Sequence, residues 1–60
     1  MPTYRYYGPR DTEPHEVVAD RYERDDDNPV TFHNVTAFDG DARQPSLLMA
    51  RVRGPVEMGD

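Results

Sequence analysis

The absence of cysteine is the strongest constraint on this sequence, because the chain has only 60 residues. Domains of this size bury about 60% of the surface of the unfolded chain, and most of them add disulfides, metal ions or oligomerisation. Without cysteine, disulfides and thiolate metal sites are excluded. Leu, Ile, Val and Phe are few, and the net charge is −5, a combination typical of disordered chains. We therefore expect a single small domain whose order is supported in part by a partner or a second copy.

The net negative charge of the chain limits the kinds of partner that it can bind. Twelve acidic residues face seven basic ones, and every basic residue is an arginine. A GC-rich coding sequence or a halophilic cytoplasm explains such a bias, and so does a need for bidentate contacts with carboxylates or phosphates. Direct binding of nucleic acid needs a net basic surface, so it is disfavoured.

No segment predicts secretion or membrane insertion. Residues 1–10 lack the apolar run of about 7–15 residues that a secretory signal requires. No stretch approaches the roughly 20 apolar residues of a membrane span. We expect a cytoplasmic protein without a membrane partner.

The first fourteen residues are predicted to form a tyrosine-rich arm or edge strand followed by a loop. Residues 3–7 are β-prone and contain three tyrosines, while Pro2, Pro9 and Pro14 bracket them. Proline within sheets is confined to edges and strand ends, which favours a peripheral position. Tyrosine rings with a polar tip suit a half-wet contact with a partner.

Residues 15–24 fit two patterns. As a strand, the segment places Val18 and Tyr22 on one face. As a helix it has only a narrow apolar stripe, although a proline is tolerated in the first turn. The narrow stripe favours the strand, and a short helix over residues 14–24 in an α+β fold is the alternative.

Two further strands are predicted, over residues 30–38 and 46–53. Residues 25–29 combine four short polar side chains with a proline, and residues 39–41 read Asp-Gly-Asp, so both predict turns. The strict alternation of apolar and polar residues fails at Asn34, which predicts a bulge or a tight turn there.

The fold class that follows is a small all-β protein. Its centre is a three-stranded antiparallel meander over residues 15–54. The arm over residues 1–14 precedes it, and a tail over residues 55–60 follows.

One resemblance supports a β-rich fold. The stretch Val-Val-Ala-Asp-Arg-Tyr-Glu-Arg at 17–24, the acidic turn and Val-Thr-Phe-His at 30–33 resemble short, mostly uncharacterised proteins of actinobacteria and their tailed phages. The likeness covers residues 15–39. It implies a small accessory protein that decorates or joins larger subunits, with incorporation into a virion as a second location. It implies no catalytic residue.

The sequence offers little for catalysis or for metal binding. Counted from Asp25, positions 6 and 12 of a calcium loop are Val30 and Thr36, which do not match. His15 and His33 lack a fixed third ligand and are expected on strand surfaces. No nucleophile elbow or phosphate loop is present, and so short a chain is expected to lack a water-excluding pocket of about 300 Å³ or more. We expect no enzyme activity, no cofactor, no metal and no small-molecule substrate.

A binding or structural role is therefore favoured, in which the protein docks on a larger assembly or associates with itself. Apolar residues occur on both parities of the strands, and so little chain cannot cover both faces. Phe32, Leu48 and Val52 are expected in the protein's own core. The residues predicted to contact a protein partner or a second copy are Tyr4, Tyr6, Tyr7, Tyr22, Leu47 and Met49.

An acidic inhibitor that mimics DNA is the alternative function. It requires a row of carboxylates on one face, for which Glu16, Asp20 and Glu23 are candidates, although Arg21 and Arg24 interrupt the row. A basic patch is also present, and its arginines are expected to pair with these acids across strands. The patch consists of Arg43, Arg51 and Arg53.

Overall fold

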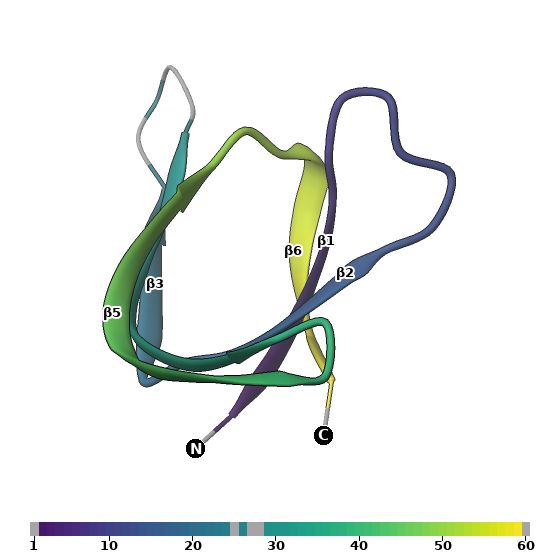
Figure 1. The fold of residues 1–60 in the computed structure, drawn as a ribbon. Coiled ribbons are helices and arrows are strands. Elements are labelled where there is room, and N and C mark those ends of the chain that lie inside the picture. Colours follow the sequence, from purple (N-terminus) through teal and green to yellow (C-terminus); the bar gives the residue numbers. More distant parts are fainter. Residues whose placement is uncertain (1, 25, 27–28, 60) are drawn as a thin grey trace.

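A computed structural model describes residues 2–24, 26 and 29–59. Within these residues the chain forms six strands in one antiparallel sheet that curls around its own core (Figure 1). No described residue lies in a helix, and none of the described segments is a helix long and apolar enough to cross a membrane. The strands are β1 (Thr3–Tyr7), β2 (His15–Val18), β3 (Arg21–Arg24), β4 (Val30–Phe38), β5 (Asp41–Ala50) and β6 (Arg53–Gly59).

Strand β4 organises the sheet, because it pairs with three other strands. On one side it pairs with β5 over nearly its whole length. On the other side its first half pairs with β3 and its last two residues pair with β2. Strand β2 continues the sheet to β1, and β1 to β6, so the order is β3-β4-β2-β1-β6 with β5 beside β4.

The all-β class is confirmed, but the sheet has six strands and not the three of the predicted meander. Residues 15–24 are neither one strand nor a helix, because Ala19 and Asp20 interrupt the strand. The Ala19 amide donates to the Pro2 carbonyl at 3.2 Å, and the Asp20 amide donates to the His33 carbonyl at 3.0 Å. These bonds to separate parts of the sheet divide the segment into β2 and β3.

The first strand is not an arm or an edge strand, because it is paired on both sides. Tyr4 lies opposite Val17 on β2 and opposite Met58 on β6. The prolines that suggested an edge lie outside β1, so they leave its hydrogen-bonding ladder intact. Residues 55–59 of the expected tail are part of β6, the seven-residue strand that pairs with the other side of β1.

Two local predictions are confirmed. Asn34 has φ = 59°, and the β4–β5 register shifts between Phe32 and Val35, which is the predicted irregularity. Asp39 and Gly40 have φ of 51° and 88°, as a two-residue type I′ hairpin turn requires. The turn predicted at residues 25–29 falls mostly outside the described residues.

The core is built from aromatic rings and small aliphatic side chains on the inner face of the sheet. Phe32 is fully buried, with ring centroids 5.9 Å from Tyr4, 5.6 Å from Tyr6 and 6.1 Å from Tyr22. Phe32 and Val52 are buried as predicted, and Leu48 packs partly buried against the cluster. The buried set is Tyr4, Tyr6, Val17, Ala19, Val30, Phe32, Val35 and Val52.

The ring cluster predicts a large effect of Phe32→Ala. Removing a buried phenyl ring costs about 3–5 kcal/mol of unfolding free energy. A domain of this size has about 0.05–0.15 kcal/mol per residue in total, so we expect the variant to be largely unfolded. Urea denaturation followed by circular dichroism measures this. Met58→Ala is the control because Met58 is 68% exposed, and its change should stay within about 0.5 kcal/mol. An unchanged midpoint for Phe32→Ala would contradict the described core.

Candidate functional site

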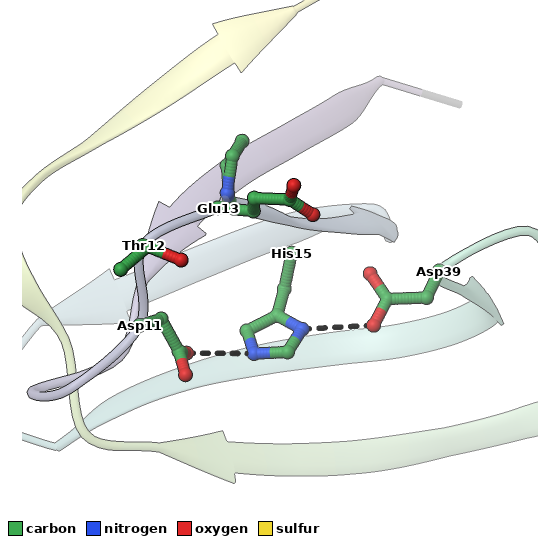
Figure 2. Close-up of a pocket in the computed structure, with 6 residues that line it drawn as sticks. Asp11, Thr12, Glu13, His15 and Asp39 are labelled. Atoms are coloured by element: carbon green, nitrogen blue, oxygen red, sulfur yellow. Dashed lines mark hydrogen bonds and ion pairs between the residues drawn. The ribbon is translucent and has the colours of Figure 1, made fainter.

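His15 lies between two carboxylates from different parts of the chain (Figure 2). Its Nδ1 is 2.8 Å from Oδ2 of Asp39, and its Nε2 is 2.8 Å from Oδ2 of Asp11. Asp11 belongs to the loop between β1 and β2, and Asp39 belongs to the turn between β4 and β5. We call these three residues the His15 clamp, since they tie the loop, strand β2 and the turn together.

The fold explains the position of the imidazole. His15 is the first residue of β2 and shares its parity with the buried Val17, so its ring points toward the inner face. It stacks on Phe38, with centroids 5.5 Å apart and planes inclined by 21°, and lies 5.2 Å from the Tyr6 ring. The aromatic rings and the two carboxylates leave the imidazole little freedom to rotate.

Asp39 is held by strand β2 through three contacts. Its Oδ1 accepts a hydrogen bond from the Glu16 amide at 2.9 Å, while its Oδ2 contacts His15. Its own amide donates to the Glu16 carbonyl at 2.7 Å. Asp39 also takes the first left-handed position of the turn, which aspartate tolerates better than most residues. The hairpin turn therefore aims this carboxylate at the histidine.

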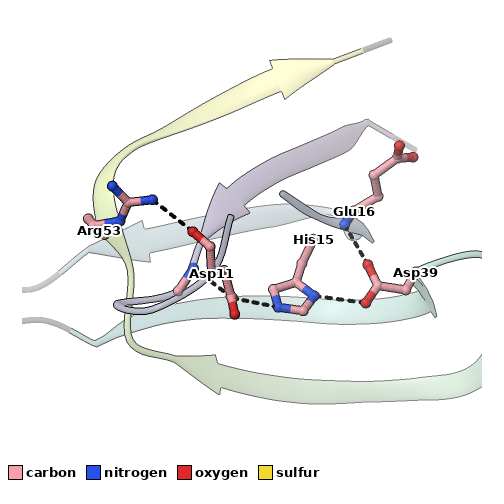
Figure 3. Close-up of polar contacts among 6 residues, drawn as sticks. Asp11, His15, Glu16, Asp39 and Arg53 are labelled. Carbon is pink, nitrogen blue, oxygen red and sulfur yellow. Dashed lines mark hydrogen bonds and ion pairs between the residues drawn. The ribbon is translucent and has the colours of Figure 1, made fainter. Parts of the chain in front are cut away.

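Asp11 fixes the other side of the clamp (Figure 3). Its Oδ2 also accepts a hydrogen bond from the Gly8 amide at 3.0 Å. Its carbonyl oxygen accepts one from Nη2 of Arg53 at 2.8 Å, which links the loop to the start of β6. The guanidinium of Arg53 lies 5.5 Å from the centre of the Tyr7 ring. A Cβ atom at position 8 would come too close to Oδ2 of Asp11, so a larger residue there would require this carboxylate to shift.

The electrostatics of the clamp favour a charged pair. The hydrogen bond that His15 donates to Asp39 raises the pKa of His15 above its ordinary value of 6.5, against a smaller opposing effect of burial and with a further contribution from Asp11. The hydrogen bond from His15 lowers the pKa of Asp39 below 3.8, and the Glu16 amide adds to this. Burial raises the pKa of Tyr6, with Asp39 and Asp11 contributing.

This arrangement ties three separate parts of the chain together. Carboxylate oxygens accept hydrogen bonds, so both imidazole nitrogens donate at the same time only when the ring is protonated. The described residues contain no group of three or more His, Asp or Glu side chains that could hold a metal ion.

A polar hollow lies beside the clamp. It has a volume of about 380 Å³. Most of its lining is solvent-exposed, so it does not exclude water. The lining residues are Asp11, Thr12, Glu13, Pro14, His15 and Asp39.

The predicted interface residues fall into two groups. Tyr4 and Tyr6 are buried in the core, so replacing both with alanine is expected to unfold the sheet and not only to remove a contact. Tyr7 is half-buried, and Tyr22 is 38% exposed. The most accessible of the predicted interface residues are Leu47, which is 59% exposed, and Met49, which is 61% exposed. These residues on β5 are the ones that the fold leaves available to a partner.

The basic patch does not pair as predicted. Arg53 donates to the carbonyl of Asp11, and no ion pair links Arg43 or Arg51 to any residue that the structure describes. The acids expected to pair with the patch have other partners. Glu16 pairs with Arg5 at 3.7 Å, and Glu23 with Arg21 at 2.9 Å. Asp20 accepts a hydrogen bond from the Asn34 amide at 2.8 Å.

Sequence reasoning missed the clamp, because its members are brought together by long-range pairing. His15 was expected on a strand surface, and it is on a strand, but with its ring on the inner side. His33 is also half-buried, with Nε2 3.7 Å from the Glu23 carboxylate. The available signals were the Asp-Gly turn and the i,i+4 spacing of Asp11 and His15, and both are too common to be specific.

The fold and the clamp together define a small all-β protein whose curled antiparallel sheet is fastened at one end by an ionic contact. No protein-family model, curated protein or solved structure matches the chain. Its function therefore has to be argued from its geometry.

The clamp predicts a stability maximum in mildly acidic solution. Because the folded pKa of His15 is raised, its stabilising effect is complete below about pH 6.5 and is lost as the pH rises through the folded value. Because the folded pKa of Asp39 is lowered, its effect is complete above about pH 3.8 and is lost as the pH falls through the folded value. Urea denaturation at a series of pH values measures the loss of stability on the alkaline side and on the acidic side. The ring-proton resonances of His15 report its pKa directly.

The histidines supply a matched pair of variants for this test. His15→Asn should reduce the loss of stability on the alkaline side. His33→Asn removes the other imidazole and should leave that loss in place. Identical alkaline limbs in wild type and His15→Asn would show that the clamp does not control this pH dependence.

Proposed function

We propose that this is a non-enzymatic binding or structural accessory protein, which docks on a larger assembly or on a second copy through strand β5. The observation that carries the proposal is the exposure of two large apolar side chains, Leu47 at 59% and Met49 at 61%. They lie two residues apart on one strand, so both project from the same face. A paired apolar surface of this kind on a marginal domain is typical of an interaction site.

The position of β5 supports the same role. Among the described strands, β5 pairs with β4 alone, so one of its edges is free. Leu48 and Ala50 pack partly buried against the core, which leaves Leu47 and Met49 on the outer face. The inner residues thus hold the strand in place while the outer residues stay accessible.

The setting we propose follows from the resemblance of residues 15–39 to short actinobacterial and phage proteins. A cytoplasmic accessory protein, or one incorporated into a virion, needs a stable docking surface and no turnover. The two carboxylates that hold His15 support a structural role for the His15 clamp. The described acids Glu16 and Glu23 are matched with arginines, so no observation favours the DNA-mimic alternative.

Charge placed on the outer face of β5 tests the proposal. The double variant Leu47→Glu/Met49→Glu should lose self-association, or the capture of a partner from lysate, because charged groups resist burial in a protein interface. Size exclusion with light scattering measures self-association, and affinity capture measures the binding of a partner. The core should survive, since both side chains point outward, and circular dichroism checks this.

Met58→Glu is the control for added charge at an exposed methionine. It lies on β6 and is 68% exposed, so its effect on assembly should be small. Equal behaviour of the β5 double variant, the Met58 variant and wild type in both assays would contradict a docking role for β5.

A further inference from the structure

Three strands of the described sheet have a free edge, and they differ in how well that edge is protected. Strand β3 consists of four residues, three of which are charged: Arg21, Glu23 and Arg24. Strand β6 contains Gly54, Pro55 and Glu57. Charges, prolines and short length are the usual protection of an edge against further pairing. Residues 46–50 of β5 read Ser-Leu-Leu-Met-Ala and have none of these features.

The second half of this segment pairs regularly with β4, while the register shift between Phe32 and Val35 lies opposite its first half. Leu48, Met49 and Ala50 lie opposite consecutive residues of β4, from Phe32 back to Val30. In an antiparallel ladder, alternate residues direct their backbone N–H and C=O groups to opposite sides, so half of them face the free edge. We call residues 46–50 the docking segment.

The docking segment has a clear boundary at its start. The β4–β5 register passes from Val35 opposite Ser46 to Ala37 opposite Ala42. Residues 43–45 therefore lie opposite a single residue of β4 and depart from the regular ladder. Pro45 lacks a backbone N–H, which further limits pairing beyond Ser46. About five residues remain for an added strand, a length of about 17 Å.

An arginine stands at each end of the docking segment. Arg43 precedes it by three positions and Arg51 follows it directly, and both are exposed. Neither forms an ion pair with a residue that the structure describes, whereas Arg5 and Arg21 each pair with a glutamate. In a chain of net charge −5, two arginines that form no ion pair within the described part of the chain thus bracket an uncharged segment of β5.

These charges decide which occupant fits. A second copy pairing antiparallel over residues 46–50 places Arg51 of one copy opposite Pro45 of the other, two positions from Arg43, so arginines of like charge lie near each other at both ends of the pairing. Both copies also carry a net charge of −5. A partner strand with carboxylates at its two ends instead meets a cation at each end.

We propose that the free edge of β5 binds an extended, apolar strand of another protein that carries acidic residues at both ends. The strand adds to the sheet by backbone hydrogen bonds to residues 46–50. Leu47 and Met49 contact its side chains on the outer face, and Arg43 and Arg51 bind its terminal carboxylates. This assignment rests on the proposed docking role of β5 and names its partner.

Two synthetic peptides test the assignment. Both have a short alternating Val/Thr centre, and one has glutamates at both ends while the other has lysines. Isothermal titration gives the affinities, and amide chemical shifts of the ¹⁵N-labelled protein give the location. We expect the glutamate peptide to bind about tenfold more tightly, with shifts concentrated at residues 46–50.

Charge reversal on the protein provides the decisive comparison. Arg43→Glu/Arg51→Glu should exchange the preference, so that the lysine peptide binds more tightly. Arg51→Glu alone should weaken the glutamate peptide more than Arg10→Glu, which makes the same change in net charge in the loop after β1. Circular dichroism confirms that each variant is folded.

The outcomes separate this assignment from the broader docking role. Equal affinity for the two peptides, or binding of neither, overturns the acidic strand as occupant. If the wild-type protein self-associates and Leu47→Glu/Met49→Glu does not, the occupant is a second copy. This result overturns the acidic strand as occupant and leaves the docking role of β5 intact. Peptide shifts confined to β3 or β6, with residues 46–50 unmoved, overturn the assignment and the docking role together.

Discussion

The bend of β4 at Asn34 is the constraint on which the rest of the sheet depends. A regular strand would place Val30 and Phe32 on one face and Val35 on the other, yet all three are buried. The left-handed backbone of Asn34 and the associated register shift return Val35 to the inner face. The same bend lets one strand pair with β3 and then with β2, so the sheet curls and encloses Phe32.

The curl also determines what remains outside. Tyr4 and Tyr6 compensate for the scarcity of aliphatic residues by filling the core with rings, and their position on a doubly paired strand fixes them there. The His15 clamp then fastens the loop after β1 to the hairpin turn after β4. Leu47 and Met49 are left on the outer face of β5, where they contribute nothing to the enclosed core.

Local features of the fold could be predicted from the sequence, and long-range ones could not. The Asp39–Gly40 turn and the irregularity at Asn34 follow from residue types with known backbone preferences. The pairing of β1 with β6 joins the two ends of the described chain, from Thr3 opposite Gly59 to Tyr7 opposite Arg53, and periodicity carries no information about such partners. A tail was predicted over residues 55–60, yet residues 55–59 belong to the edge strand β6. The clamp was hidden for the same reason, since Asp39 reaches His15 only after β2 and β4 have paired.

The pairing of the first and last strands has a consequence for the order of folding. The β4–β5 hairpin is local, and its type I′ turn favours early formation. The ladder between β1 and β6 joins Thr3 to Gly59, so it closes a loop of almost the whole described chain. High contact order of this kind slows folding, which makes closure by β6 the late step. Until that step, one side of β1 is an unpaired edge, and the nascent sheet is most exposed to wrong partners.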